Sequence, residues 1–142
     1  MYERRTHPLA SRRSVPLASL PEHAYVSREL GSGTREVIDH YLRKAGLSAD
    51  ALQVVMEASS PEALKGLVAT GLGYAIMSSV TVEKEVRLRE LVQIPLEPRL
   101  LRRLAVVYPK ERFHSKAVSG FVRFAKERLG ATRSAEARFA AD

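Results

Sequence analysis

The chain has 142 residues, no cysteine and a hydrophobic fraction of 45%, which suits one domain, or one lobe with part of another, and excludes disulfide and thiolate chemistry. Its 23 Lys and Arg residues exceed its 16 Asp and Glu residues and give a net charge of +7, which is compatible with an anionic ligand or with a place near nucleic acid and establishes neither. No apolar run approaches the roughly 18 residues of a membrane span, and no signal peptide is evident, so a soluble, cytoplasmic protein is expected.

Residues 1–22 are polar and irregular, and prolines interrupt their short apolar pieces. Residues 15–17 predict at most a brief strand within this segment. No independent core fits into 22 residues of this composition, so the segment must pack against another part of the protein.

Strands and helices alternate in the predicted structure of residues 24–94. The expected strands are 24–28, 52–56, 74–77 and 91–94, and the expected helices are 33–45, one that begins within 59–62, and one around 79–86. Such alternation predicts an α/β fold with a mainly parallel sheet and helices on both faces. Further along, a strand at 104–108 and a helix at 115–129 are expected, and the tail 131–142 is either a helix extension or disordered.

The turn between the first strand and the first helix is the strongest candidate for a binding site. Residues 28–35 read Arg-Glu-Leu-Gly-Ser-Gly-Thr-Arg, so Ser32 and Thr34 bring hydroxyls to a glycine turn. The first N–H groups of a helix lack partners inside it and carry partial positive charge, and Arg28 and Arg35 add full charge. A small anion or carboxylate is the natural ligand. An ordinary helix start with solvated arginines is the alternative.

The second helix also begins at hydroxyl residues. Ser59 and Glu62 fit a capping box, while Ser60 with Pro61 at the first helical position fits the alternative register. Ligands of parallel sheets bind at the carboxyl ends of the strands. The hydroxyl clusters at 32–35, 59–60 and 78–79 are therefore expected along one edge of the sheet.

No pattern indicates catalysis, a metal or a cofactor. The segment Gly31-Ser-Gly33 lacks the third glycine of a dinucleotide fingerprint, and neither a P-loop nor a Gly-x-Ser-x-Gly nucleophile elbow occurs. The four histidines are not at metal-ligand spacing. Aromatic residues are few and are not interleaved with basic ones, which argues against a single-stranded nucleic-acid platform.

Several motifs occur in the order and spacing of a known family. They are His7-Pro-Leu-Ala10, Arg28-Glu-Leu-Gly-Ser-Gly-Thr-Arg35, Ser59-Ser-Pro-Glu-Ala-Leu-Lys65, Val68-Ala-Thr-Gly-Leu-Gly-Tyr-Ala-Ile76 and Phe121-Val-Arg-Phe124. With them the chain resembles, over roughly residues 5–129, the effector-binding region of LysR-type bacterial transcriptional regulators.

The resemblance implies two Rossmann-like lobes of the type 2 periplasmic-binding-protein kind, with a small effector in the cleft between them. Residues 23–97 resemble the complete second lobe, and residues 1–22 and 98–130 resemble a remnant of the first lobe. The family's winged helix-turn-helix domain and the opening elements of the first lobe have no counterpart. We therefore expect a truncated piece of a longer protein.

By motif match, the resemblance places the effector contacts of this lobe at the glycine turn and at two further helix starts. The expected residues are Ser32, Gly33, Thr34 and Arg35, with Ser59, Ser60, Met77 and Ser78 as further candidates. Half of the cleft is not encoded, so this chain alone should bind its effector weakly or not at all. Strand 104–108 and helix 115–129 lack their lobe partners, which favours self-association into a homo-oligomer.

The function implied is that of a ligand-sensing regulatory domain. A small effector shifts lobe closure or dimer geometry, and DNA-binding domains elsewhere in the full protein respond. The first alternative is a stand-alone solute-binding domain without DNA function, against which the missing signal peptide and incomplete first lobe argue. The second is a small flavodoxin-like enzyme, which the missing catalytic constellation disfavours. Direct DNA binding by this chain is not expected.

Overall fold

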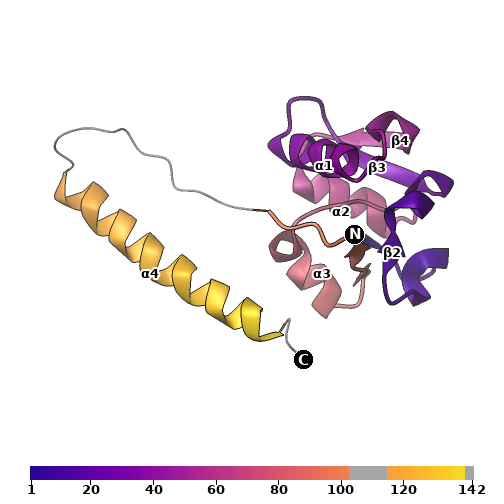
Figure 1. Cartoon of the computed structure of the whole chain (residues 1–142). Helices are drawn as coiled ribbons and strands as arrows, with labels where there is room; N and C mark the ends of the chain where they lie inside the picture. Colours follow the sequence, from indigo (N-terminus) through magenta and orange to yellow (C-terminus); the bar gives the residue numbers. More distant parts are fainter. Residues whose placement is uncertain (103–114, 140–142) are drawn as a thin grey trace. The chain divides into compact units, whose positions relative to one another are not determined.

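The computed structural model describes residues 1–102 and 115–139, and the chain divides into two compact units, Met1–Arg102 and Arg103–Asp142 (Figure 1). The described part of the second unit is the helix α4, Lys116–Phe139. It begins as predicted at Ser115, whose hydroxyl accepts a hydrogen bond from the Val118 N–H at 3.2 Å. It ends later than position 129 because the tail continues the helix to Phe139. The strand predicted at 104–108 lies outside the described residues.

The first unit contains the βαβα succession that the sequence predicts. Strand β3 (Ala24–Arg28) is followed by α1 (Gly33–Lys44), β4 (Gln53–Ala58) and α2 (Pro61–Ala69). Strands β3 and β4 pair in parallel, with Ala24 opposite Gln53 at one end and Arg28 opposite Ala58 at the other. The predicted α/β class and this part of the sheet are confirmed.

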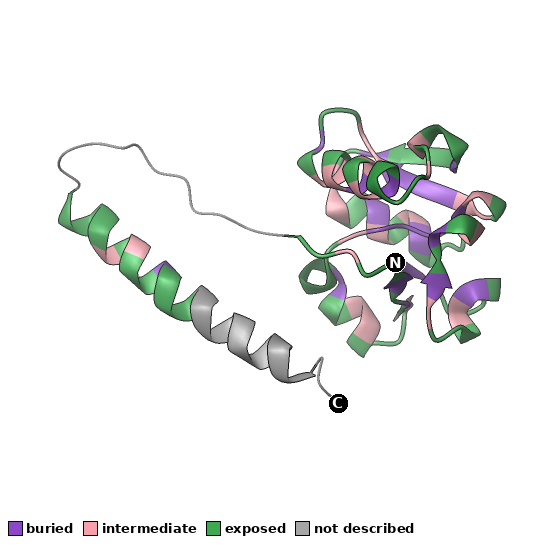
Figure 2. Ribbon diagram, in the orientation of Figure 1, coloured by how far each residue is buried: buried purple, intermediate pink, exposed green. Residues whose placement is uncertain are grey.

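Helices cover both faces of β3, as expected. Tyr25 belongs to a buried cluster with Ile38 and Leu42 of α1. The next residue, Val26, belongs to a second buried cluster with Leu64 and Val68 of α2. Successive side chains of a strand point to opposite faces, so α1 and α2 lie on opposite sides of the strand. Figure 2 shows β3 buried between them.

Residues 74–76 are buried and Met77 is partly buried, but the segment 74–77 forms only single bridges instead of the predicted strand. Tyr74 bridges Tyr25 in parallel, and Ala75 bridges Tyr2 in antiparallel orientation. The backbone comes very close to β3 at Gly73: a Cβ on this residue would lie 2.3 Å from the carbonyl oxygen of Ala24. The segment thus connects β3 to the N-terminal strand without a ladder of its own.

The N-terminal residues complete the sheets of this unit. Strand β1 (Tyr2–Arg4), which the sequence pattern does not predict, pairs antiparallel with β5 (Leu91–Gln93). The brief strand expected at 15–17 is present as β2 (Val15–Pro16) and pairs in parallel with β6 (Leu96–Glu97). Residues 1–22 therefore pack against another part of the protein, as expected, and their strand partners are β5 and β6.

The strands β5 and β6 belong to the same compact unit as residues 1–22. The division predicted at residue 23 does not coincide with the boundary between the units, which falls after Arg102. Assignment of 1–22 or 98–130 to a first lobe stays a prediction.

Short helices fill the remaining connections. They are the 3-10 turns η1 (Pro8–Ser11), η2 (Leu17–Glu22), η3 (Ala49–Ala51) and η4 (Ser79–Val82), and the helix α3 (Glu83–Arg87). The short helix predicted around 79–86 is thus confirmed as a 3-10 turn that runs into an α-helical turn.

Candidate functional site

Three chain segments end at one edge of the β3–β4 sheet. The parallel pairing of Arg28 with Ala58 brings the turn at 32–35 and the helix start at 59–60 to the same side. Residues 74–76 run in parallel beside β3, since Tyr74 bridges Tyr25 and its carbonyl accepts the Val26 N–H at 2.9 Å. Residues 77–78 therefore follow at that side too. We call residues 32–35, 59–60 and 77–78 the carboxyl edge.

Ser32 is the N-cap residue of α1. Its backbone N–H donates to the Glu29 carbonyl at 3.2 Å, and its carbonyl accepts the Glu36 N–H at 3.0 Å. The residue is only 7% exposed, and its hydroxyl makes no capping hydrogen bond. A hydroxyl without a capping role thus lies at the start of α1, where the N–H groups of residues 33–35 lack acceptors inside the helix.

The turn geometry depends on one glycine. Gly31 has a φ of +82°, a backbone conformation that L side chains rarely adopt. Gly33, by contrast, is the first residue of α1, and a Cβ placed there would meet no atom within 4 Å. Gly33 therefore leaves open space in front of the helix start.

Arg102 also lies at the start of α1, which the sequence pattern does not predict. Its Nη1 donates a hydrogen bond of 3.2 Å to the hydroxyl of Thr34. The residue lies 68 positions further along the chain, and in the sequence it is one of many scattered basic residues. Only the fold brings this guanidinium to the N-terminus of α1.

Arg28 is not a free charge at this edge. Its guanidinium donates to both carboxylate oxygens of Glu29, at 2.7 and 2.8 Å, and to the carbonyls of Ala58 at 3.2 Å and Ser59 at 3.4 Å. The Arg28 hydrogen bond holds the pKa of Glu29 below its ordinary value. Arg28 therefore joins β3 to β4. Its positive charge, expected from the sequence to attract a ligand, is neutralised by Glu29.

Arg35 is also paired. Its Nη1 lies 2.5 Å from Oε1 of Glu57 and donates to the Arg28 carbonyl at 2.9 Å, and its Nε lies 3.9 Å from Asp39. The expectation that Arg28 and Arg35 add full positive charge is therefore corrected. What Arg35 offers to this edge is its backbone N–H.

The start of α2 uses the second of the two predicted registers. The Ser60 hydroxyl accepts the Ala63 N–H at 3.1 Å, and Pro61 is the first helical residue. Ser59 is exposed and forms no capping box with Glu62. Since the Ser60 hydroxyl already caps the helix, Ser59 is the available hydroxyl at this part of the carboxyl edge.

The third part of the carboxyl edge contains Met77 and Ser78. Met77 is partly buried and packs against the core cluster beside α2. Ser78 is exposed, and its carbonyl accepts the Thr81 hydroxyl at 2.7 Å while its own hydroxyl makes no capping hydrogen bond. The structure thus brings all eight predicted site residues to one edge, whereas their role in binding stays a prediction.

Two kinds of feature are absent from the described part of the chain. Residues 1–102 and 115–139 contain no group of three or more His, Asp or Glu side chains that could hold a metal ion. Over the same residues, no helix has the length and apolar character to cross a membrane.

Comparisons with known proteins agree on a family. The sequence model of the family described as "LysR substrate binding domain" matches residues 3–130. A probable RuBisCO transcriptional regulator of Synechocystis sp. is 34% identical over 118 residues, which are 82% of this chain and 34% of the relative. The RuBisCO operon transcriptional regulator of Allochromatium vinosum is 35% identical over 119 residues, 83% of this chain and 38% of the relative. The chain thus spans little more than a third of these relatives.

Solved structures show the same fold. The regulatory domain of Synechocystis CcmR in complex with 2-PG is 26% identical, with a TM-score of 0.71 over 87% of this chain and 58% of that chain. The effector-binding domain of QuiR in complex with shikimate is 19% identical, with a TM-score of 0.66 over 87% of this chain and 57% of that chain. The second likeness shows the fold alone.

Proposed function

Because the chain belongs to the LysR substrate binding domain family, we propose that it is the ligand-sensing domain of a LysR-type transcriptional regulator and binds a small anionic or carboxylate effector at the carboxyl edge. The DNA is contacted by a helix-turn-helix domain outside these residues. The family is one of regulators, and we propose no catalytic activity for this chain.

One observation carries the proposed site. The residue Ser32 is only 7% exposed, its hydroxyl makes no capping hydrogen bond, and it lies at the N-terminus of α1. A carboxylate or phosphoryl oxygen at this place would accept hydrogen bonds from the hydroxyl and from the unpartnered helix N–H groups, and the helix dipole would favour its charge.

The charge balance of the edge supports recognition by polar groups instead of a strong ion pair. Arg28 and Arg35 are already paired with Glu29 and Glu57. A further cation at this edge is Arg102. Its guanidinium donates a hydrogen bond to the Thr34 hydroxyl, which is a neutral group and leaves the positive charge of Arg102 in place. A monoanion held by hydroxyl and N–H donors, with Arg102 nearby, fits this arrangement.

The comparison with CcmR supports the ligand size. Its regulatory domain has been solved with 2-PG, which makes a small molecule the natural expectation for this chain as well. We propose an effector of that size range and leave its identity to a screen.

A titration monitored residue by residue tests the site. Small carboxylates and phosphorylated metabolites are added at millimolar concentration to the isotopically labelled chain, and backbone amide shifts are followed by NMR. The expected result is weak binding, with shifts concentrated at residues 32–35 and abolished by the double variant Ser32→Ala/Thr34→Ala.

The matched control is the double variant Ser48→Ala/Thr70→Ala. It also removes one serine and one threonine hydroxyl, at exposed positions before η3 and at the end of α2 that do not belong to the carboxyl edge. This control should bind like the parent chain. Shifts that persist in Ser32→Ala/Thr34→Ala would place the ligand elsewhere.

We also propose that the full regulator is oligomeric. In α4 the side chains of Phe121 and Phe124 are 62% and 54% exposed, and apolar surface of this kind commonly marks an interaction site. Light scattering of the chain should show a mass above 15.8 kDa. A single monomeric species at high concentration would contradict this.

A further inference from the structure

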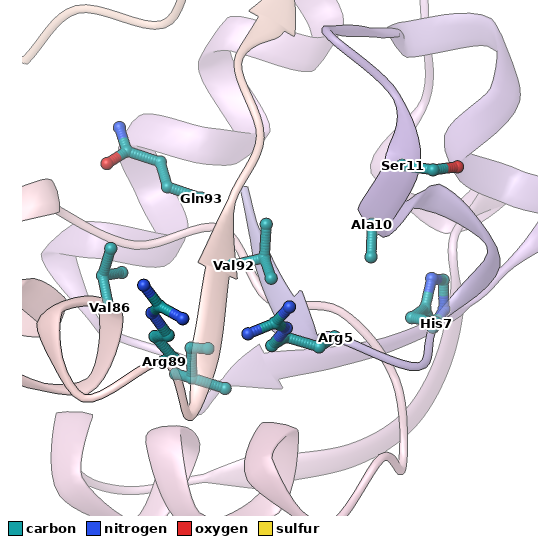
Figure 3. Close-up of a pocket in the computed structure, with 9 residues that line it drawn as sticks. Arg5, His7, Ala10, Ser11, Val86, Arg89, Val92 and Gln93 are labelled. Atoms are coloured by element: carbon teal, nitrogen blue, oxygen red, sulfur yellow. The ribbon is translucent and has the colours of Figure 1, made fainter.

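An open depression of about 660 Å³ lies beside β1 and β5, and none of its lining residues belongs to the carboxyl edge (Figure 3). Two arginines, Arg5 and Arg89, line it together with His7, Ser11 and Gln93. Within the described part of the chain, no acidic residue lines the depression. Its polar groups are therefore cationic or neutral.

Strand pairing explains why the two arginines line the same depression. Arg4 lies opposite Leu91 in the antiparallel β1–β5 pair. Arg5 follows Arg4, and Arg89 precedes Leu91 by two positions, so both lie just beyond the same end of the pair. Figure 3 shows both side chains at the same end of β5, among the residues that line the depression.

These guanidinium groups differ from those at the carboxyl edge. Within residues 1–102 and 115–139, every salt bridge found involves other residues, so neither Arg5 nor Arg89 has an acidic partner there. The carboxyl group of Glu3 is buried against His7, which lines the depression. Burial raises the pKa of Glu3 to about 7, which reduces its negative charge near neutral pH.

The backbone of Arg89 is unusual in a way that points to its side chain. Arg89 has a φ of 61° and occupies the position after the C-cap of α3, with its N–H bonded to the Val86 carbonyl at 3.0 Å and the Glu90 N–H bonded to the Glu85 carbonyl at 2.9 Å. This is the Schellman arrangement, in which glycine is the usual residue because a Cβ is unfavourable there. Arg89 therefore occupies a position in which glycine would suit the backbone better.

We propose that Arg5 and Arg89 form a second binding site, for a small tetrahedral oxyanion such as phosphate or the phosphoryl group of a small molecule. The planar guanidinium fork matches two oxygens of such an anion. The hydroxyl of Ser11 and the amide of Gln93 are neutral donors on the walls of the same depression.

Titration of inorganic phosphate into the 142-residue chain by calorimetry and amide NMR, at constant ionic strength with chloride as the reference anion, tests the proposal. Phosphate should bind with shifts around residues 5, 11, 89 and 93, and Arg5→Gln and Arg89→Gly should each weaken binding at least tenfold. Arg87→Gln, on α3 but outside the depression, should bind like the parent chain. Glycine suits the left-handed position, so Arg89→Gly separates loss of binding from loss of folding.

Three results would overturn the proposal. The first is phosphate binding that is no tighter than chloride binding, or that is equally tight in both arginine variants and the parent chain. The second is loss of phosphate binding in Ser32→Ala/Thr34→Ala alone, which would assign the anion to the carboxyl edge and leave the proposed effector site intact. The third is salt-dependent binding of duplex DNA through Arg5 and Arg89 without any response to phosphate, which would replace the small anion by a nucleic-acid backbone.

Discussion

The carboxyl group of Glu3 lies directly against Nδ1 of His7, and this nitrogen also accepts the Leu9 N–H at 3.3 Å. An Nδ1 that accepts a hydrogen bond carries a lone pair and no proton. Neither buried oxygen of Glu3 has a hydrogen-bond partner in the described part of the chain, so an ionised carboxylate there would lack the hydrogen bonds that stabilise its charge. Burial raises the pKa of Glu3 to about 7, and burial together with His23 lowers the pKa of His7. Both shifts favour the neutral form of each group, a protonated carboxyl and an unprotonated imidazole.

Stability should depend on pH through Glu3. Its pKa rises from an ordinary 4.5 to about 7 on folding, so the folded state binds the proton more tightly between those values. The contribution of Glu3 to stability is complete below about 4.5 and is lost as pH rises through 7. Glu3→Gln should remove this dependence and raise the free energy of unfolding at pH 8 by an amount on the order of 2 kcal/mol.

Urea denaturation at pH 5 and pH 8 measures this effect, with Glu22→Gln, at an exposed position, as the control. The Met1 ammonium, whose pKa burial lowers from 8.0 to about 6, acts in the opposite direction. Its burial destabilises the folded chain below about pH 6, and this penalty disappears as pH rises to 8. Met1 is present in both chains, so the difference between variant and parent chain reports Glu3 together with its charge interaction with the Met1 ammonium. Equal pH slopes for Glu3→Gln and the parent would contradict the neutral pair.

The capping register at α2 gives a second test. Ser60→Ala removes the hydroxyl that accepts the Ala63 N–H and should lower the free energy of unfolding by about 1 kcal/mol. Ser59→Ala, one position earlier, should leave stability unchanged because Ser59 does not cap the helix. Thermal or chemical unfolding of the two variants decides between the registers, and a larger loss for Ser59→Ala would support the capping box.

Replacement of Arg89 by glycine should stabilise the chain. The left-handed conformation with φ of 61° costs a residue with a Cβ about 1 kcal/mol relative to glycine. Arg89→Gly is therefore expected to raise the unfolding midpoint in urea, whereas Arg87→Gly, inside α3, should lower it. A lower midpoint for Arg89→Gly would show that contacts of the arginine outweigh the backbone cost.

Two glycines offer a matched pair for the packing of segment 74–77. A Cβ on Gly73 would lie 2.3 Å from the Ala24 carbonyl oxygen, while a Cβ on Gly33 would meet nothing within 4 Å. Gly73→Ala should cost about 2 kcal/mol or more, because the buried backbone would have to move. Gly33→Ala should change stability by less than about 0.5 kcal/mol. Circular dichroism melts of both variants give the comparison.

Local sequence patterns predict the elements whose signals lie within a few residues. Strand β3 and helices α1 and α2 follow from an apolar run, helical periodicity and a Ser-Pro helix start. Strand β1 does not follow from such a pattern, because it has three residues, includes the charged Glu3, and finds its partner around Val92. A pairing over that separation leaves no local signal.

The candidate site shows the same division between local and distant information. The sequence predicts that Ser32 and Thr34 lie at a helix start, and the parallel order of strands predicts their common edge with Ser59. It does not predict that Glu57 neutralises Arg35 or that Arg102 reaches Thr34. Side-chain charge partners depend on neighbouring strands and on the path of the chain after β6, which local patterns do not contain.

The pairing of Tyr2 with Gln93 and the hydrogen bond from the Ile94 N–H to the Met1 carbonyl at 3.0 Å also constrain the order of folding during synthesis. The residues of β1 leave the ribosome well before those of β5 and cannot find their partner until β5 has been made. Until then the side chain of Tyr2, which is buried in the folded unit, stays in water or on a chaperone. Closing such a long loop is slow compared with local helix formation, so β1 and its partner β5 should acquire protection from hydrogen exchange later than β3 and β4.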